Sequence, residues 1–264
     1  MPKSPSTILF IHGWATDTAV WDDQVRRFGG SFDILNMNLP GHGGEQRWAE
    51  PTLDAALREV ERRVKGLKDG SVIGIGWSLG AQVLIETAVR HGAKFNSLVL
   101  VGATPCFVRT DGFPWGQPRA LVKRMVLDMK KDPVATLKRF YALNFTEGES
   151  GTEGVRGFIG RYAPPGPGPT VQPGCAPSFS YAEVTTALEA LYNTDIRGSL
   201  AKINVPALVI HGERDGVCPV KAGLYLASNL RNAELKVFNG SGHGPFITRP
   251  AEFHEAVMGF IARL

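Results

Sequence analysis

The chain has 264 residues, of which 43% are hydrophobic and 20% are charged, and its formal net charge is +4 at pH 7. This composition is ordinary for a globular protein and excludes a disordered or fibrous chain. The basic excess is small and matches no nucleic-acid-binding motif, so we expect no nucleic-acid partner. No apolar run is long enough to span a membrane, so we expect no membrane partner either.

The cysteines are few and far apart in the sequence. Cys106, Cys175 and Cys218 are odd in number and widely spaced, which favours neither a disulfide framework nor a thiolate metal site. The first residues run directly into an apolar strand-like segment, without the basic and apolar regions of a secretion signal. We therefore expect a cytoplasmic protein. Nothing in the sequence suggests a metal ion or an organic cofactor.

In the first hundred residues, short apolar runs alternate with amphipathic ones. Apolar residues spaced by three and four between Leu53 and Leu67 predict a helix, with Thr52 as its N-cap. Four runs predict strands, namely Ile8–Ile11, Phe32–Asn36, Ser71–Gly76 and Ser97–Val101. Strands that alternate with helices form a mainly parallel sheet covered on both faces.

The alternation stops near Cys106 and resumes near Asn193. Between these positions the spacing of apolar residues predicts helices near 122–129, 132–144 and 181–191, and the Pro/Gly-rich stretch 163–169 must be a loop. Two further strands, Ala207–Ile210 and Leu235–Phe238, and a helix over 250–264 follow. The sequence thus predicts a core of residues 1–105 and 194–264, interrupted by a helical cap of residues 106–193.

The most informative motif is the segment Gly76–Gly80, which reads G-W-S-L-G. A strand-like run precedes it and a helix-like run follows it. The two glycines allow a sharp turn that would leave the hydroxyl of Ser78 exposed above the sheet edge, beside the first N–H groups of the helix. The motif predicts Ser78 as the nucleophile of ester or other acyl-transfer chemistry. The alternative is a Gly-rich turn whose serine only caps a helix.

A nucleophilic serine needs a base, and the base needs a carboxylate that orients it. Asp215 follows the fifth predicted strand, and His243 follows the sixth in a glycine-rich loop. Functional groups gather at the carboxyl ends of the strands in open α/β sheets. We therefore expect Asp215 and His243 to converge on Ser78.

Other residues compete for these roles. Glu213 could serve as the acid, but Asp215 is favoured because it opens a turn, whereas Glu213 lies nearer the strand end. Among the other histidines, His42 is expected to be structural, and His91 and His254 are expected on the surfaces of helices.

An oxyanion hole needs two backbone donors. The N–H of Leu79, directly after the nucleophile, is the first, and the second is expected from the loop after the first strand. In that loop Gly13 permits an unusual turn, and the N–H of Trp14 is the candidate donor, with its ring as a wall of the acyl pocket. The alternative is an ordinary strand exit with a core tryptophan.

These motifs together resemble those of the α/β-hydrolases, a family with a mostly parallel central sheet flanked by helices and an inserted helical cap. More narrowly, the chain is similar to the methyl ester esterases of biotin synthesis, whose substrate is a pimeloyl chain on acyl-carrier protein. The similar stretches span nearly the whole chain: Ile11–Trp14, Leu39–Gly41, Gly76–Gly80, Thr104–Phe107, Pro114–Gly116, Arg139–Asn144, Asp215–Pro219, His243–Phe246 and Pro250–Phe253.

The resemblance implies roles for individual residues. Ser78 would be the nucleophile, His243 the base and Asp215 its orienter, while Trp14 and Leu79 would bind the ester carbonyl. Phe140 to Asn144 would line an acyl tunnel from the cap. The chain departs from the family pattern over 147–178, and Asn144 stands where the family has a glutamine.

Charge in the cap bears on a protein partner. Between Gly116 and Thr146 there are seven basic and two acidic residues, so 7 − 2 gives an excess of +5. An acidic acyl-carrier protein would be attracted to such a surface; a solvated helix face is the alternative. The resemblance implies a serine carboxylesterase acting on a carrier-bound methyl ester. A general short-chain carboxylesterase without a carrier protein and a ligand receptor with little turnover remain alternatives.

Overall fold

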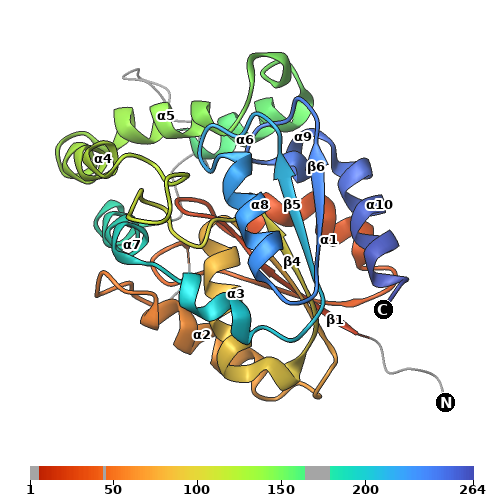
Figure 1. The fold of residues 1–264 in the computed structure, drawn as a ribbon. Helices are drawn as coiled ribbons and strands as arrows, with labels where there is room; N and C mark the ends of the chain where they lie inside the picture. The colour runs from red at the N-terminus through yellow and green to blue at the C-terminus, as the bar shows by residue number, and fades with distance from the viewer. Residues whose placement is uncertain (1–5, 44–45, 164–178) are drawn as a thin grey trace.

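The computed structural model describes residues 6–43, 46–163 and 179–264. Within them, six strands form one parallel sheet in the order β2-β1-β3-β4-β5-β6 (Figure 1). The strands are β1 Thr7–Ile11, β2 Asp33–Met37, β3 Val72–Trp77, β4 Phe95–Val101, β5 Ala207–Gly212 and β6 Ala233–Phe238. All six predicted strands are confirmed, with boundaries that differ by no more than two residues.

Burial explains the sequence of each strand. Every residue of β3 and β5 is buried, and both strands are nearly continuous apolar runs, as expected for a parallel sheet covered on both faces. In β6, at the sheet edge, residues are alternately half-buried and exposed until the buried Phe238. The middle of the sheet is therefore a rigid support for the loops at its carboxyl edge.

Helices cover both faces of the sheet. Helices α1 (Asp22–Phe28) and α10 (Pro250–Ile261) lie together on one face, and α2 (Asp54–Val64), α3 (Leu79–His91) and α8 (Val220–Asn229) lie on the other (Figure 1). The predicted N-cap of α2 is wrong: Leu53 occupies that position, while Thr52 Oγ1 accepts the N–H of Asp54 over 3.4 Å. This helix also ends at Val64, before Leu67.

Among the described residues, four helices lie in the segment that we propose as a cap, residues 106–193. They are α4 Arg119–Lys131, α5 Pro133–Leu143, α6 Glu153–Tyr162 and α7 Tyr181–Asn193. Helices α5 and α6 run along the top of the view in Figure 1, on the side where the strands end, and α4 lies at the left, in contact with α5 and α7. Helix α5 begins where its sequence suggests, because Asp132 Oδ1 accepts the N–H of Ala135 over 3.0 Å and Pro133 occupies the first turn. Most of the loop predicted at 163–169 lies outside the described residues.

Shorter elements complete the chain. These are the 3-10 turns Thr18–Trp21, Gly92–Lys94, Glu147–Glu149 and Arg197–Lys202, and the short helix α9 Pro245–Thr248. In the part of the chain that the structure describes, none of the helices has the length and apolar character needed to traverse a lipid bilayer. Cys106 and Cys218 are buried thiols, and Cys175 falls outside the described residues.

Candidate active site

The serine of the G-x-S-x-G motif lies on a sharp turn between β3 and α3. Ser78 has a φ of 53° and a ψ of −112°, a backbone conformation that residues other than glycine rarely adopt. Its N–H donates to the carbonyl oxygen of Val101, at the end of β4, over 2.9 Å. Strain that the surrounding structure maintains in this way is typical of functional sites.

Both glycines of the motif are required by close packing. A Cβ at Gly76 would lie 2.7 Å from the carbonyl oxygen of Gly80, and a Cβ at Gly80 would lie 2.5 Å from the carbonyl oxygen of His12. The turn is therefore pressed against the end of β1 and the loop that follows it. This is the loop from which the sequence predicts the second oxyanion donor.

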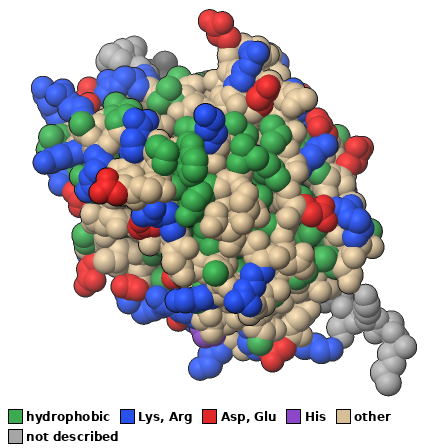
Figure 2. Space-filling view, in the orientation of Figure 1, with side chains coloured by type: hydrophobic (Ala, Val, Ile, Leu, Met, Phe, Trp, Pro, Cys, Tyr) green, Lys and Arg blue, Asp and Glu red, His purple; other side chains and the backbone are tan. Residues whose placement is uncertain are grey.

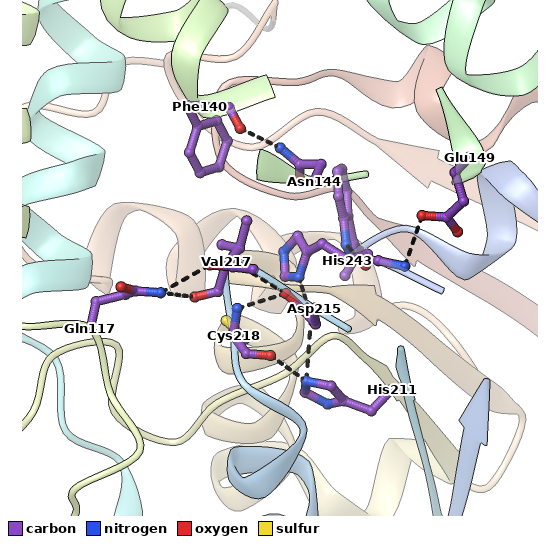
Figure 3. A network of polar contacts seen from close by, with 12 residues as sticks. Gln117, Phe140, Asn144, Glu149, His211, Asp215, Val217, Cys218 and His243 are labelled. Carbon is purple, nitrogen blue, oxygen red and sulfur yellow. Dashed lines mark hydrogen bonds and ion pairs between the residues drawn. The ribbon is translucent and has the colours of Figure 1, made fainter. Parts of the chain in front are cut away.

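Asp215 and His243 form a buried hydrogen-bonded pair (Figure 3). The Nδ1 of His243 lies 2.7 Å from Asp215 Oδ2, while Asp215 Oδ1 accepts the N–H groups of Val217 and Cys218, each over 2.8 Å. Burial alone would raise the pKa of Asp215. The charge of His243 and the hydrogen bonds from His211 and His243 outweigh burial and hold this pKa well below its usual range. Asp215 can thus fix the orientation of the imidazole as a carboxylate.

The alternative acid faces elsewhere. Glu213 is exposed, and its Oε2 accepts the N–H of Gly240 over 2.7 Å. The geometry therefore favours Asp215 as the partner of His243.

His243 lies beside the nucleophile turn. Its carbonyl oxygen accepts the indole N–H of Trp77 over 2.9 Å, and a Cβ at Gly102 would lie 2.8 Å from its Nδ1. Trp77 precedes Ser78, and Gly102 follows the residue to which Ser78 donates. Among the described residues, no group is hydrogen-bonded to His243 Nε2. A base and its nucleophile often become hydrogen-bonded only when the substrate is in place.

The predicted oxyanion donors lie on adjoining segments. Leu79 begins α3, so its N–H has no acceptor within the helix. Trp14 is buried, its indole N–H donates to the carbonyl oxygen of Val184 in α7 over 2.6 Å, and its ring contacts Phe140 edge-on at 4.7 Å between centroids. The residue with positive φ in this loop is Ala15, at 55°, rather than Gly13. Gly13 is required because a Cβ would lie 2.8 Å from the Trp77 ring.

A mostly apolar groove of about 490 Å³ opens between α4, α5 and the loop that carries Asp215. Phe140 lines it, together with Leu121, Met125, Leu143 and Val217. Neither Asn144 nor Trp14 is among the lining residues. Asn144 is fully buried, and its side-chain amide donates to the carbonyl oxygens of Phe140 and Tyr141, where it closes the end of α5. The groove therefore begins on the surface of the cap and ends beside the acid loop.

Two basic residues of the cap line this groove. Arg124 and Arg139 are exposed at its rim, where both face Asp128 at distances of 2.8 and 3.6 Å. Lys130 is paired with Glu189 on α7 over 2.6 Å. Figure 2 shows Lys and Arg side chains gathered at the upper left, over the region of α4 in Figure 1, with hydrophobic side chains next to them.

Two buried histidines support the oxyanion loop. His12 Nε2 accepts the N–H of Leu39 over 2.9 Å, and its Nδ1 lies 2.8 Å from the carbonyl oxygen of Gly13. The ring of His42 lies 5.4 Å from that of His12, and its Nδ1 lies 2.8 Å from the carbonyl oxygen of Pro40. Burial lowers the pKa of His12 to about 4 and that of His42 to about 3. Both are therefore neutral packing groups near pH 7.

Sequence reasoning missed two side chains that contact this site. His211 Nε2 lies 2.6 Å from the carbonyl oxygen of Cys218 and 3.3 Å from Asp215 Oδ2, so it is a second imidazole on the acid. Glu149, in the proposed cap, binds the loop of His243 through Ser241 and Gly242 (Figure 3). The pattern T-x-x-E at Thr146–Glu149, a capping box, could have drawn attention to Glu149. No local pattern indicated His211.

Known proteins resemble this chain in sequence over most of its length. A model of the alpha/beta hydrolase family matches residues 8–256. A pimeloyl-[acyl-carrier protein] methyl ester esterase from Nitrosomonas europaea is 33% identical over 249 residues, which cover 93% of this chain and 92% of that protein. The protein of the same name from Aromatoleum aromaticum is 32% identical over 93% of this chain and 94% of its own length.

Solved structures share the fold. An esterase from Exiguobacterium antarcticum superposes with a TM-score of 0.84 at 23% sequence identity, over 98% of this chain and 92% of that one. An enol-lactonase from Burkholderia xenovorans gives a TM-score of 0.81 at 20% identity, over 98% of this chain and 92% of that one. At such identities the likeness concerns the fold alone.

Proposed function

Because the chain belongs to the alpha/beta hydrolase family, we propose that it is a serine carboxylesterase that hydrolyses the methyl ester of pimeloyl-acyl-carrier protein in biotin synthesis. The observation that carries this proposal is the similarity, over 93% of the chain, to relatives named for that reaction. The buried Asp215–His243 pair beside the strained turn of Ser78 supports it independently, because this geometry suits nucleophilic attack on an ester.

In the proposed reaction, Ser78 Oγ attacks the carbonyl carbon of the methyl ester and His243 Nε2 accepts its proton. The N–H groups of Leu79 and Trp14 stabilise the oxyanion of the tetrahedral intermediate. His243 then gives the proton to the leaving methoxide, methanol departs, and the acyl group stays on Ser78. Water activated by His243 hydrolyses this acyl-enzyme, which releases the free carboxylate and restores the serine.

A carrier-bound chain would approach this site along the groove, which ends at Gly216 and Val217 next to Asp215. Its apolar lining suits the methylene chain, whereas the carrier protein would stay outside against the basic rim. Arg124 and Arg139 are exposed there, and charges at an interface rim mainly increase the rate of encounter. On this account the methyl ester reaches Ser78 first, and the thioester to the carrier remains intact.

Two measurements test the proposal. The chain should restore biotin-independent growth to cells that lack their own esterase for this step, and the Ser78→Ala variant should not. In solution, methanol should be released faster from the carrier-bound methyl ester than from a free methyl ester of the same acid. Equal rates on both substrates, with no growth, would instead assign a general short-chain carboxylesterase. No turnover of any ester would assign a receptor.

A further inference from the structure

The loop that carries His243 is bound by a buried carboxylate from the segment that we propose as a cap. Glu149 is only 7% exposed. Its Oε1 accepts the hydroxyls of Ser241 over 2.6 Å and Thr248 over 2.8 Å, and its Oε2 accepts the N–H of Gly242 over 2.9 Å. The N–H of Thr146 also donates to Oε2, over 2.9 Å. Glu149 therefore binds the chain on both sides of His243.

All the donors to this carboxylate are neutral groups. A buried carboxylate is costly unless hydrogen bonds replace its water, and hydrogen bonds to a charged acceptor are about twice as strong as neutral ones. Burial alone would raise the pKa of Glu149. The hydrogen bonds from Ser241, Thr146, Thr248 and Gly242 outweigh it and lower this pKa below its ordinary value. The carboxylate of Glu149 is therefore ionised at neutral pH, and each of its two oxygens accepts hydrogen bonds.

The same short segment holds His243 itself. The N–H of His243 donates to the carbonyl oxygen of Asn144 over 2.7 Å, five residues before Glu149. Gly242 packs so closely here that a Cβ would collide with this carbonyl oxygen and lie 3.0 Å from Glu149 Oε2. Residues 144–149 and 241–243 thus form one tightly packed junction.

From these contacts we propose that Glu149 is a positioning residue for His243, through which the cap segment fixes the orientation of the base. The inference rests on the proposed role of His243. A displacement of about 1 Å in a reacting group can reduce the rate by roughly 100-fold. In Glu149→Gln an N–H₂ group takes the place of one carboxylate oxygen and faces other donors. Ser241 or Gly242 would then lose the acceptor of its hydrogen bond. The base loop would then move while the groove between α4 and α5 stays intact.

The experiment compares Glu149→Gln with Glu147→Gln, a matched control on the same 3-10 turn whose side chain is exposed. Well below the melting temperature, Glu149→Gln should lower kcat for a nitrophenyl ester by roughly 10- to 100-fold and leave KM within about two-fold. The control should retain its full kcat. A folded Glu149→Gln protein with unchanged kcat and a lower Tm would overturn the proposal and leave Glu149 as a structural anchor.

A double-variant cycle separates positioning from general damage. If Glu149 acts through His243, Glu149→Gln should cause no further loss of kcat in a His243→Ala background. A full additional loss would overturn the inference. Should Glu149→Gln fail to fold, Ser241→Ala serves in both comparisons, because it removes the shortest hydrogen bond to Glu149 together with the contact between the hydroxyls of Ser241 and Thr248. A His243→Ala variant with full activity would refute the proposed function itself, which is a distinguishable outcome.

Discussion

The hydroxyl of Tyr141 donates a hydrogen bond of 2.5 Å to the carbonyl oxygen of Ala15. Ala15 is the strained residue of the loop after β1, with a φ of 55°, and Tyr141 belongs to α5 in the proposed cap. Trp14, one residue earlier, donates its indole N–H to α7. The loop that would supply an oxyanion donor is therefore hydrogen-bonded to two helices of the cap segment, α5 and α7.

Tyr141→Phe should weaken this support. The substitution leaves a buried carbonyl oxygen without its donor, which costs about 1 to 3 kcal/mol of unfolding free energy. We expect kcat to fall by roughly 10-fold through misplacement of the Trp14 N–H, with little change in KM. Urea unfolding and nitrophenyl ester kinetics measure both effects. Tyr192→Phe is the control, because its hydroxyl bonds Arg119 at the surface. Equal effects in the two variants would contradict the assignment.

The two candidate acids can be separated directly. Asp215→Asn should keep the fold but favour the wrong tautomer of His243, lowering kcat by roughly 10³ to 10⁴. Glu213→Gln should have a small effect, since Glu213 only accepts an exposed backbone N–H. Circular dichroism checks the fold of both variants, and ester kinetics give the loss of kcat in each relative to the wild type. The reverse order of the two losses would move the acid to Glu213.

Stability should fall with acid because two histidines are buried as neutral groups. The folded pKa is about 4 for His12 and about 3 for His42, below the unfolded value of 6.5. The unfolded chain therefore binds more protons in this window, so their stabilising contribution is complete above pH 6.5 and is lost as pH falls toward 4. Each histidine contributes a slope of about 1.4 kcal/mol per pH unit.

Urea unfolding across that pH range measures the slope. His42→Gln should lower it by roughly half, and a slope that the substitution leaves unchanged would show that other groups titrate instead.

Charge reversal should distinguish encounter with a carrier from chemistry on the ester. Changing Lys123, Arg124 and Arg139 to glutamate should raise KM for the carrier-bound ester. It should leave kcat/KM for a nitrophenyl ester within about a few-fold, because exposed charges act mainly on association. Added salt should remove the wild-type preference for the carrier-bound substrate, since physiological salt screens charges over about 8 Å.

Reversal of Lys65, Lys68 and Lys202 is the matched control, because these exposed residues lie near the opposite edge of the sheet. Equal losses on both substrates would show that the cap charges support folding instead.

The sequence predicted the elements whose signals are local. The apolar runs of β1 to β6 and the pairing of Asp132 with Pro133 at the start of α5 depend on neighbouring residues. Ser78, Asp215 and His243 were predicted because each follows a strand of one parallel sheet. Asp215 and His243 do meet, although they are 28 residues apart.

What was missed depends on long-range contacts or weak propensity. Helix α6 contains Gly154, Gly157 and Gly160, which lower its helical signal. Glu149 and Ser241 lie 92 residues apart, so nothing in either local sequence indicates their contact. Threonine is a residue type that often caps helices, but the hydroxyl of Thr52 lies next to Asp54. The N-cap position of α2 is Leu53, one residue later than predicted. The predicted place of Asn144 in the wall of an acyl tunnel stays a prediction. In the structure its side-chain amide donates to carbonyl oxygens at the end of α5.

Release of methanol from the methyl ester of pimeloyl-acyl-carrier protein tests most directly whether Ser78 is the nucleophile of an esterase acting on this substrate. We predict that the wild type releases one methanol per substrate and leaves the carrier thioester intact. The Ser78→Ala variant, folded as the wild type, should lose all but about 10⁻⁴ to 10⁻⁶ of kcat. The opposite result is a Ser78→Ala variant that retains more than about a hundredth of the wild-type rate, well above the residual contribution of an oxyanion hole alone. That result would contradict the role of Ser78 as the nucleophile.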